Sequence, residues 1–170
     1  MEPLSYDEFK DLAHTSKRAF HLELKDTYNV AAEDEPFGKW QRGEPDHYDW
    51  HQDWLSFLRE VTASGTQVQR VRVVSVPHTD YTRWGSDVAR LNAEAGEDVR
   101  YLPRHMAIEI DWPDDDFWLL DDDKLVLSVF SADGRTGGFA RENNPQLLAL
   151  CLAVRDQVWD RAVPYADYIA

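Results

Sequence analysis

The run from Val68 to Val76 constrains the fold more than any other segment of the chain. It reads Val-Gln-Arg-Val-Arg-Val-Val-Ser-Val, so β-branched residues dominate it, and Pro77 follows at its end. A run of this kind is typical of a central strand that other elements cover on both faces. Proline cannot continue a central strand, because it has no N–H to donate. We therefore expect a sheet built around this strand.

Helical patterns flank this strand on both sides. Ser5 and Glu8 have the spacing of a capping box, and Asn144 stands as an N-cap before a proline. Gly65 and Gly96 follow two amphipathic segments as stop signals. The predicted helices run from Tyr6 to Ser16, from Asp46 to Ala63, from Asp80 to Glu94 and from Pro145 to Ala162.

Strand patterns fill most of the remaining chain. Alternating or continuous apolar residues predict strands at 20–24, 99–102 and 106–110 and a hairpin of 116–120 with 125–130. Residues 31–46 are predicted to be an irregular connection that can include a short turn of helix, and residues 131–138 to be a turn. The order of elements indicates an α/β (α+β) fold: a single domain with a mixed central sheet flanked by helices.

Composition narrows the class of protein. The 170 residues hold 18 Lys and Arg against 32 Asp and Glu, a net charge of −14, and 43% of them are hydrophobic. This is enough apolar material for one folded domain, and the charge disfavours binding to nucleic acid or anionic membranes. No stretch approaches the ~18 to 20 apolar residues of a membrane span. The single cysteine, Cys151, fits a reducing compartment, so we expect a soluble cytoplasmic protein. The oligomeric state stays open.

All basic residues of the middle third are arginines. They are Arg59, Arg70, Arg72, Arg83, Arg90, Arg100 and Arg104, and six acidic residues balance them. Arginines in such a segment either form internal ion pairs, the more common outcome, or bind an anionic group. Both interpretations remain open for Arg70 and Arg72, whose predicted internal partners are Asp98, Asp121 or Asp122.

No motif for catalysis or for a cofactor is present. His47 and His51 share one helix face, but a zinc site needs a third strong ligand from elsewhere. The acidic triplets at 114–116 and 121–123 lack the spacing of a calcium loop. There is no Gly-x-Ser-x-Gly elbow, Walker lysine or Gly-x-Gly-x-x-Gly loop, and Cys151 lies in the apolar stretch of the last helix. We expect no cofactor and no metal.

Several segments together resemble a known family. They are Gln69-Arg70-Val71-Arg72-Val73-Val74-Ser75, Thr79-Asp80-Tyr81 with Arg83, Ala95-Gly96-Glu97-Asp98, and Asp115-Asp116-Phe117-Trp118-Leu119-Leu120-Asp121-Asp122. With the strand at 20–24 and the tail Arg161-Ala162-Val163-Pro164, they resemble an actinobacterial family of proteins of unknown function. The resemblance implies genes that lie beside those of helix-turn-helix regulators and small partner proteins.

A more distant resemblance concerns residues 65–163. Their order of strand, helix, strand and hairpin is similar to one lobe of the phospholipase D fold, with residues 1–64 as an N-terminal helix, strand and long helix. Active members of that fold carry His-x-Lys followed after four residues by Asp. Aligning Asp121 or Asp122 with that Asp places acidic residues at the His position. The resemblance therefore implies a degenerate lobe without phospholipase chemistry.

These observations predict a non-catalytic regulatory or partner-binding domain that acts with a helix-turn-helix regulator. Arg70 and Arg72 share one strand face, and polar and aromatic residues follow the carboxyl end of that strand, where α/β sheets bind ligands. A small anionic or aromatic molecule, or an acidic peptide, would suit them. The candidate binding residues are Arg70, Arg72, Asp80, Tyr81, Arg83, Trp84, Asp121 and Asp122.

Two alternatives belong to other classes. One is an enzyme in which Asp80, Asp121 or Asp122 works with His78 or His105. The other is an acidic inhibitor that mimics nucleic acid, for which the net charge is the support. Under each of these interpretations the predicted core is the same, with Trp54, Leu58, Val71, Val73, Trp118 and Leu120 pointing inward.

Overall fold

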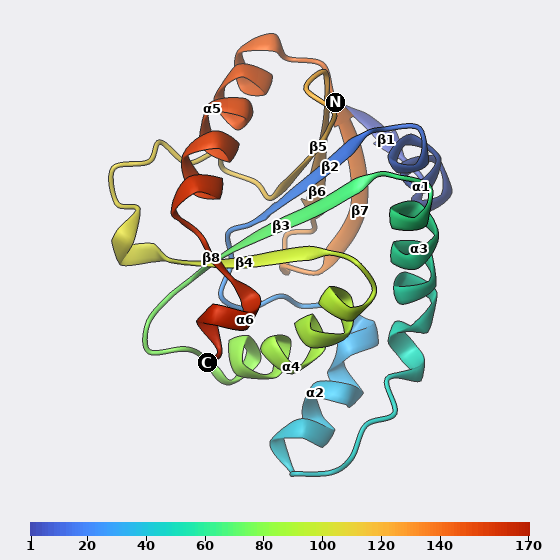
Figure 1. Cartoon of the computed structure of the whole chain (residues 1–170), viewed down its shortest axis with the longest axis vertical. Coiled ribbons are helices and arrows are strands. Elements are labelled where there is room, and N and C mark those ends of the chain that lie inside the picture. Colours follow the sequence, from blue (N-terminus) through green and yellow to red (C-terminus); the bar gives the residue numbers. More distant parts are fainter.

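Strand β3 (Gln67–Val74) is an inner strand of an eight-stranded sheet in the computed structural model, which describes residues 1–170 (Figure 1). The strands follow the order β1-β7-β6-β5-β2-β3-β4-β8. β2, β3 and β4 are parallel, and the other neighbours are antiparallel. The mixed sheet predicted from the sequence is thus confirmed. The other strands are β1 (Glu2–Leu4), β2 (Arg18–Glu23), β4 (Asp98–Pro103), β5 (Phe117–Leu120), β6 (Lys124–Phe130), β7 (Thr136–Glu142) and β8 (Val163–Pro164).

Six α-helices accompany the sheet, and two of the predicted caps are present. The Ser5 hydroxyl accepts from the Glu8 backbone N–H while Glu8 accepts from Ser5, and the Asn144 side chain accepts from two N–H groups. No helix combines the length and the apolar composition that a membrane crossing requires. The helices are α1 (Tyr6–His14), α2 (Asp34–Gln41), α3 (Gln52–Ala63), α4 (Asp80–Glu94), α5 (Pro145–Arg161) and α6 (Tyr165–Tyr168).

The two faces of the sheet are covered by different helices, as Figure 1 shows with α5 on one side and α1 and α3 on the other. Leu22, Val71 and Val73 point to the α5 face and form the larger apolar cluster with Val154 and Val158 of that helix. On the opposite face, a second cluster joins α1 and α3 to β2, β3, β5 and β6 and includes Leu58, Trp118 and Leu120. Of the six predicted core residues, five are buried and Trp54 is half-buried.

A row of polar side chains interrupts the second face. Residues alternate across a strand, so the apolar residues of β2 and β3 that face α5 place His21, Glu23, Arg70 and Arg72 on the other side. The parallel register pairs His21 with Arg70 and Glu23 with Arg72. This row lies between the apolar cluster beneath α3 and a smaller one beneath α4, and it positions the candidate site.

Several predicted elements were wrong or incomplete. Residues 106–110 are not a strand: a 3-10 turn at Arg104–Met106 precedes a loop in which Ala107 and Ile110 are buried and Ile108 is exposed. The predicted turn at 131–138 contains the start of β7, whose glycines carry little strand signal. The predicted connection at 31–46 holds α2. The long helix begins only at Gln52, because the left-handed backbone of Tyr48 and a short 3-10 turn precede it.

Candidate functional site

A pocket of about 420 Å³ lies over the polar row. Its walls come from α3, α4, the segment between β2 and α2, and strands β5, β6 and β7. Volumes of this size hold small organic molecules in other proteins. Aromatic side chains supply much of the lining: Tyr6, Tyr28, Trp54, Tyr81, Trp84, Trp118, Phe130 and Phe139.

Glu23 is the shared counter-ion at the base of the pocket. One oxygen, Oε1, accepts from Arg70 Nη1 at 3.2 Å, and the other, Oε2, lies 3.5 Å from Arg72 Nη1. Burial opposes the charge of Glu23, but the guanidinium groups of Arg70 and Arg72 hold its pKa at about 2. Glu23 is therefore ionised at neutral pH.

Arg70 connects this group to a second carboxylate. Its Nη2 donates to Glu97 Oε2 at 3.0 Å, and the Glu97 side chain is almost fully buried. Burial raises the pKa of Glu97, while Arg70 opposes that shift. The Asn92 amide contacts Glu97 and also lies 2.6 Å from His51 Nε2, so a chain of polar contacts continues to the start of α3.

Arg72 lacks partners for part of its guanidinium. Its side chain is only 9% exposed, yet neither Nε nor Nη2 has a hydrogen-bond partner. The rings of Tyr28 and Tyr81 lie 5.4 and 5.5 Å from its central carbon, at cation–π distance. Most buried polar groups in proteins are satisfied. Arg70 Nε and Glu23 Oε2 also lack hydrogen-bond partners, so the unpartnered atoms are concentrated around Arg72.

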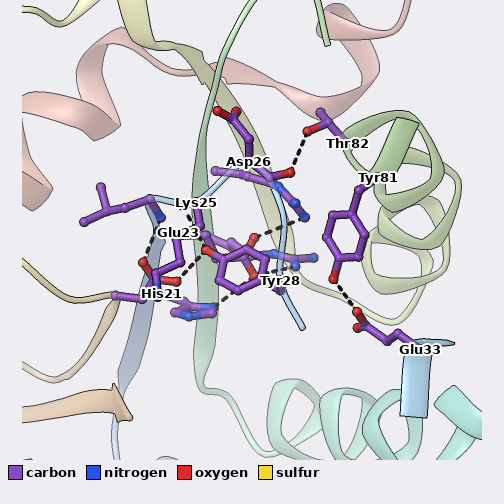
Figure 2. Close-up of polar contacts among 12 residues, drawn as sticks. His21, Glu23, Lys25, Asp26, Tyr28, Glu33, Tyr81 and Thr82 are labelled. Atoms are coloured by element: carbon purple, nitrogen blue, oxygen red, sulfur yellow. Dashed lines mark hydrogen bonds and ion pairs between the residues drawn. The ribbon is translucent and has the colours of Figure 1, made fainter. Parts of the chain in front are cut away.

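Two tyrosine–carboxylate pairs flank Arg72. Tyr28 donates its hydroxyl proton to Asp116, and Tyr81 donates to Glu33, a contact that Figure 2 shows. Burial raises the pKa of Asp116 to about 6, against the hydrogen bonds from Tyr28 and from the Leu24 N–H. Burial also raises the pKa of Glu33, while its hydrogen bond from Tyr81 opposes the shift. These carboxyl groups thus ionise less readily than exposed ones.

The structure brings together four of the eight predicted site residues. Arg70, Arg72, Tyr81 and Trp84 line the pocket, over the face of the sheet and not beyond the carboxyl end of β3. Asp80 and Arg83 form an ion pair on the exposed side of α4, outside the pocket lining.

Asp121 and Asp122 lie at the other end of the sheet. Asp121 accepts from the backbone N–H groups of Lys17 and Arg18, at the start of β2, and Asp122 pairs with Arg155 of α5. Arg70 and Arg72 do form internal ion pairs, as one of the two interpretations predicted, but the named partners Asp98, Asp121 and Asp122 were wrong, because Glu23 and Glu97 take that place. The register places Asp98 opposite Gln69, so its carboxylate pairs with Arg100 instead.

Several residues that complete the pocket carry no recognisable signal in the sequence. The polar positions of β2 alternate with Phe20 and Leu22, which predicted only a half-buried strand. Glu97 follows a helix-stop glycine and has no local signal of its own. The polar lining residues that were not predicted for this site are His21, Glu23, Tyr28, Glu33, His51, Asn92, Glu97 and Asp116, of which His51 and Asp116 had been considered only as metal ligands.

The other residues considered for chemistry do not converge here. His78 Nε2 lies 2.6 Å from the Tyr168 hydroxyl, beyond the carboxyl end of β3, and His105 lies in the 3-10 turn after β4. No three His, Cys, Asp or Glu side chains are grouped closely enough to hold a metal ion.

The chain belongs to a family that comparison with family models identifies. The family described as domain of unknown function (DUF6879) matches residues 7–170, nearly the whole chain. A search among curated proteins finds no match. The expected membership in a family of unknown function is thus confirmed.

Proposed function

We propose that this protein is a non-catalytic regulatory domain that binds a small ring-containing molecule in the pocket over β2 and β3. The observation that carries the proposal is the pairing of aromatic walls with a buried, incompletely partnered guanidinium on Arg72. Burying unpaired donors is costly unless another group satisfies them. A ligand that enters the pocket would supply that group.

The chemistry of the lining favours binding over catalysis. Arg70 forms ion pairs with both Glu23 and Glu97, which fixes the positions of these three side chains. The acids named for an enzymatic alternative lie apart, because Asp80 is near the carboxyl end of β3 and Asp121 is at the start of the parallel strand β2. This separation supports the non-catalytic interpretation.

The proposed partner is a helix-turn-helix regulator in the cytoplasm, as the family resemblance implies. The segment between β2 and α3 closes one side of the pocket, where Glu33 accepts from Tyr81. Outside the pocket lining, Trp40 Nε1 of α2 donates to Asp87 of α4 at 2.8 Å. A ligand that shifts these contacts would change the surface of α2. The same proposal includes a distant relation of residues 65–163 to one lobe of the phospholipase D fold, without the His-x-Lys motif of its active members.

Ligand binding is tested by titrating the protein with neutral, acidic and basic aromatic compounds. Trp54, Trp84 and Trp118 line the pocket, so occupancy should change tryptophan emission and raise the melting temperature. Arg83→Ala serves as a control outside the pocket and should respond like the unchanged protein. No response from any compound at millimolar concentration would refute the proposal.

The regulatory part needs a second experiment. Purification of the untagged protein from extracts of its own cells should recover a helix-turn-helix protein in stoichiometric amount. Ligand that saturates the pocket should change the amount recovered. Recovery of the protein alone, with or without ligand, would contradict the regulatory role and leave the binding role standing.

A further inference from the structure

The free part of the Arg72 guanidinium has a defined shape. Nε and Nη2 lie on the same edge of the planar group, and their two N–H bonds point in parallel. Both atoms are buried and have no partner, whereas Nη1 faces Glu23 Oε2 at 3.5 Å. The free donors therefore form one complete two-pronged edge.

Neighbouring side chains and helix α4 enclose the rest of the guanidinium. The Tyr28 and Tyr81 rings lie near the guanidinium at 5.4 and 5.5 Å. At Gly85 of α4, an added Cβ would come within 3.1 Å of Arg72 Nη1. Glycine inside a helix is less stabilising than alanine, so Gly85 leaves room for the guanidinium at the expense of helix stability. The helix, the two rings and Glu23 together hold Arg72 in place.

We propose that the ligand of this pocket is an aromatic carboxylate, whose two oxygens accept both hydrogen bonds of the free Arg72 edge. This inference rests on the proposed binding function and adds the chemical class of the ligand. A carboxylate matches the spacing of two parallel guanidinium N–H groups. Its ring then lies among the aromatic walls that include Trp84 and Trp118.

The charge of the pocket lining favours a carboxylate over a phosphate ester as the ligand. Both Nη atoms of Arg70 already pair with Glu23 and Glu97, which leaves only its single Nε donor unpartnered, and no lysine lines the pocket. Glu33 and Asp116 lie in the same lining and repel additional negative charge whenever they are ionised. One free edge of one cation suits a monoanion, and a dianionic phosphate would meet too little positive charge.

The test compares matched probes at pH 7 by tryptophan emission and calorimetry. Benzoate and 2-naphthoate should bind saturably, and benzamide and 2-naphthamide, which carry no charge, should bind at least tenfold more weakly. Two charge-assisted hydrogen bonds support a difference of this size. Phenyl phosphate should bind more weakly than benzoate.

Two variants assign the effect to Arg72. Arg72→Lys keeps the positive charge but removes the two parallel N–H donors. The dissociation constants of the acid and the amide should then lie within about threefold of each other. Gly85→Ala keeps every charged group, displaces the guanidinium tip and should weaken acid binding alone. Arg83→Lys, outside the pocket, should bind both probes like the unchanged protein.

The outcomes separate the two proposals. Amides that bind as tightly as the acids would overturn the carboxylate inference and leave the pocket's binding function intact. Phenyl phosphate as the tightest probe, or unchanged acid binding in both Arg72→Lys and Gly85→Ala, would overturn it as well. Failure of every probe, neutral and charged, would overturn both proposals.

Discussion

The imidazole of His21 stacks flat on the indole of Trp118, with ring centroids 4.2 Å apart and planes 8° from parallel. The two residues are paired across β2 and β5. Burial lowers the pKa of His21 to about 4; Glu23 opposes this shift, and the cations Arg70 and Arg72 add to it. At neutral pH the ring is therefore uncharged and forms part of the pocket base.

This environment predicts a stability loss in mild acid. An unfolded chain protonates His21 near pH 6.5, but the folded protein does so only near pH 4, so between these values the unfolded state binds more protons. The contribution of His21 to the free energy of unfolding is complete above pH 6.5. It declines by up to about 3 kcal/mol as the pH falls towards 4. Urea unfolding at pH 7 and pH 4.5 measures the decline.

A matched variant isolates this effect. Asp116, with a pKa raised to about 6, acts in the opposite direction, because its protonation favours the folded state as the pH falls. The comparison is therefore made between the unchanged protein and His21→Gln, which retains Asp116. We expect a smaller acid loss in the variant, and equal losses would contradict a neutral buried His21.

Leu58 of α3 should be among the most sensitive core positions. Its side chain is fully buried in the cluster that joins α1 and α3 to the sheet. Leu58→Ala should lower the free energy of unfolding by about 2 to 5 kcal/mol, through lost burial and the cavity left behind. Chemical denaturation measures this, with the exposed Glu60→Ala on the same helix as control. A loss below about 1 kcal/mol would show that α3 is not tightly packed.

Local signals predicted most of the elements but not the site. The helix Asp80–Glu94 was predicted with both of its ends, and Gly96 was its expected stop signal; the structure adds an N-cap at Thr79 and a positive φ at Gly96. Such signals act within a few residues of each other. The central strand was recognisable because its β-branched residues occur in one continuous run.

The pocket depends on contacts that no local pattern contains. His21 and Glu23 alternate with buried residues in the same way as the solvent-facing side of a strand. Only the packing of α3 and α4 over that face makes them buried, and only the strand register places Glu23 beside Arg72. Glu97 likewise reaches Arg70 from a position 27 residues away. Candidate residues could be named, but their partners could not.

The charge of the chain predicts weak interaction with DNA. With a net charge of −14, the protein should not shift a random duplex at about 0.15 M salt in an electrophoretic assay. It should also leave a bis-phosphodiester reporter intact, since the His-x-Lys residues of phospholipase D are missing. A retarded duplex or turnover of the reporter would contradict these expectations.

Arg83 and Trp84 are neighbours in α4 with opposite environments. Arg83 has a side chain that is 54% exposed and pairs with Asp80, whereas Trp84 is buried and packs against Phe37 and Trp50 beside the pocket. Trp84→Ala should therefore lower the free energy of unfolding by about 3 to 5 kcal/mol and weaken binding of an aromatic carboxylate. Arg83→Ala should change stability by no more than about 0.5 kcal/mol and leave that binding unchanged.

Chemical denaturation and tryptophan-emission titration of both variants provide the measurement, with Trp84→Phe to test whether a smaller ring retains part of the packing. Weakened binding in Arg83→Ala, together with full binding in Trp84→Ala, would move the site away from this pocket to the exposed side of α4.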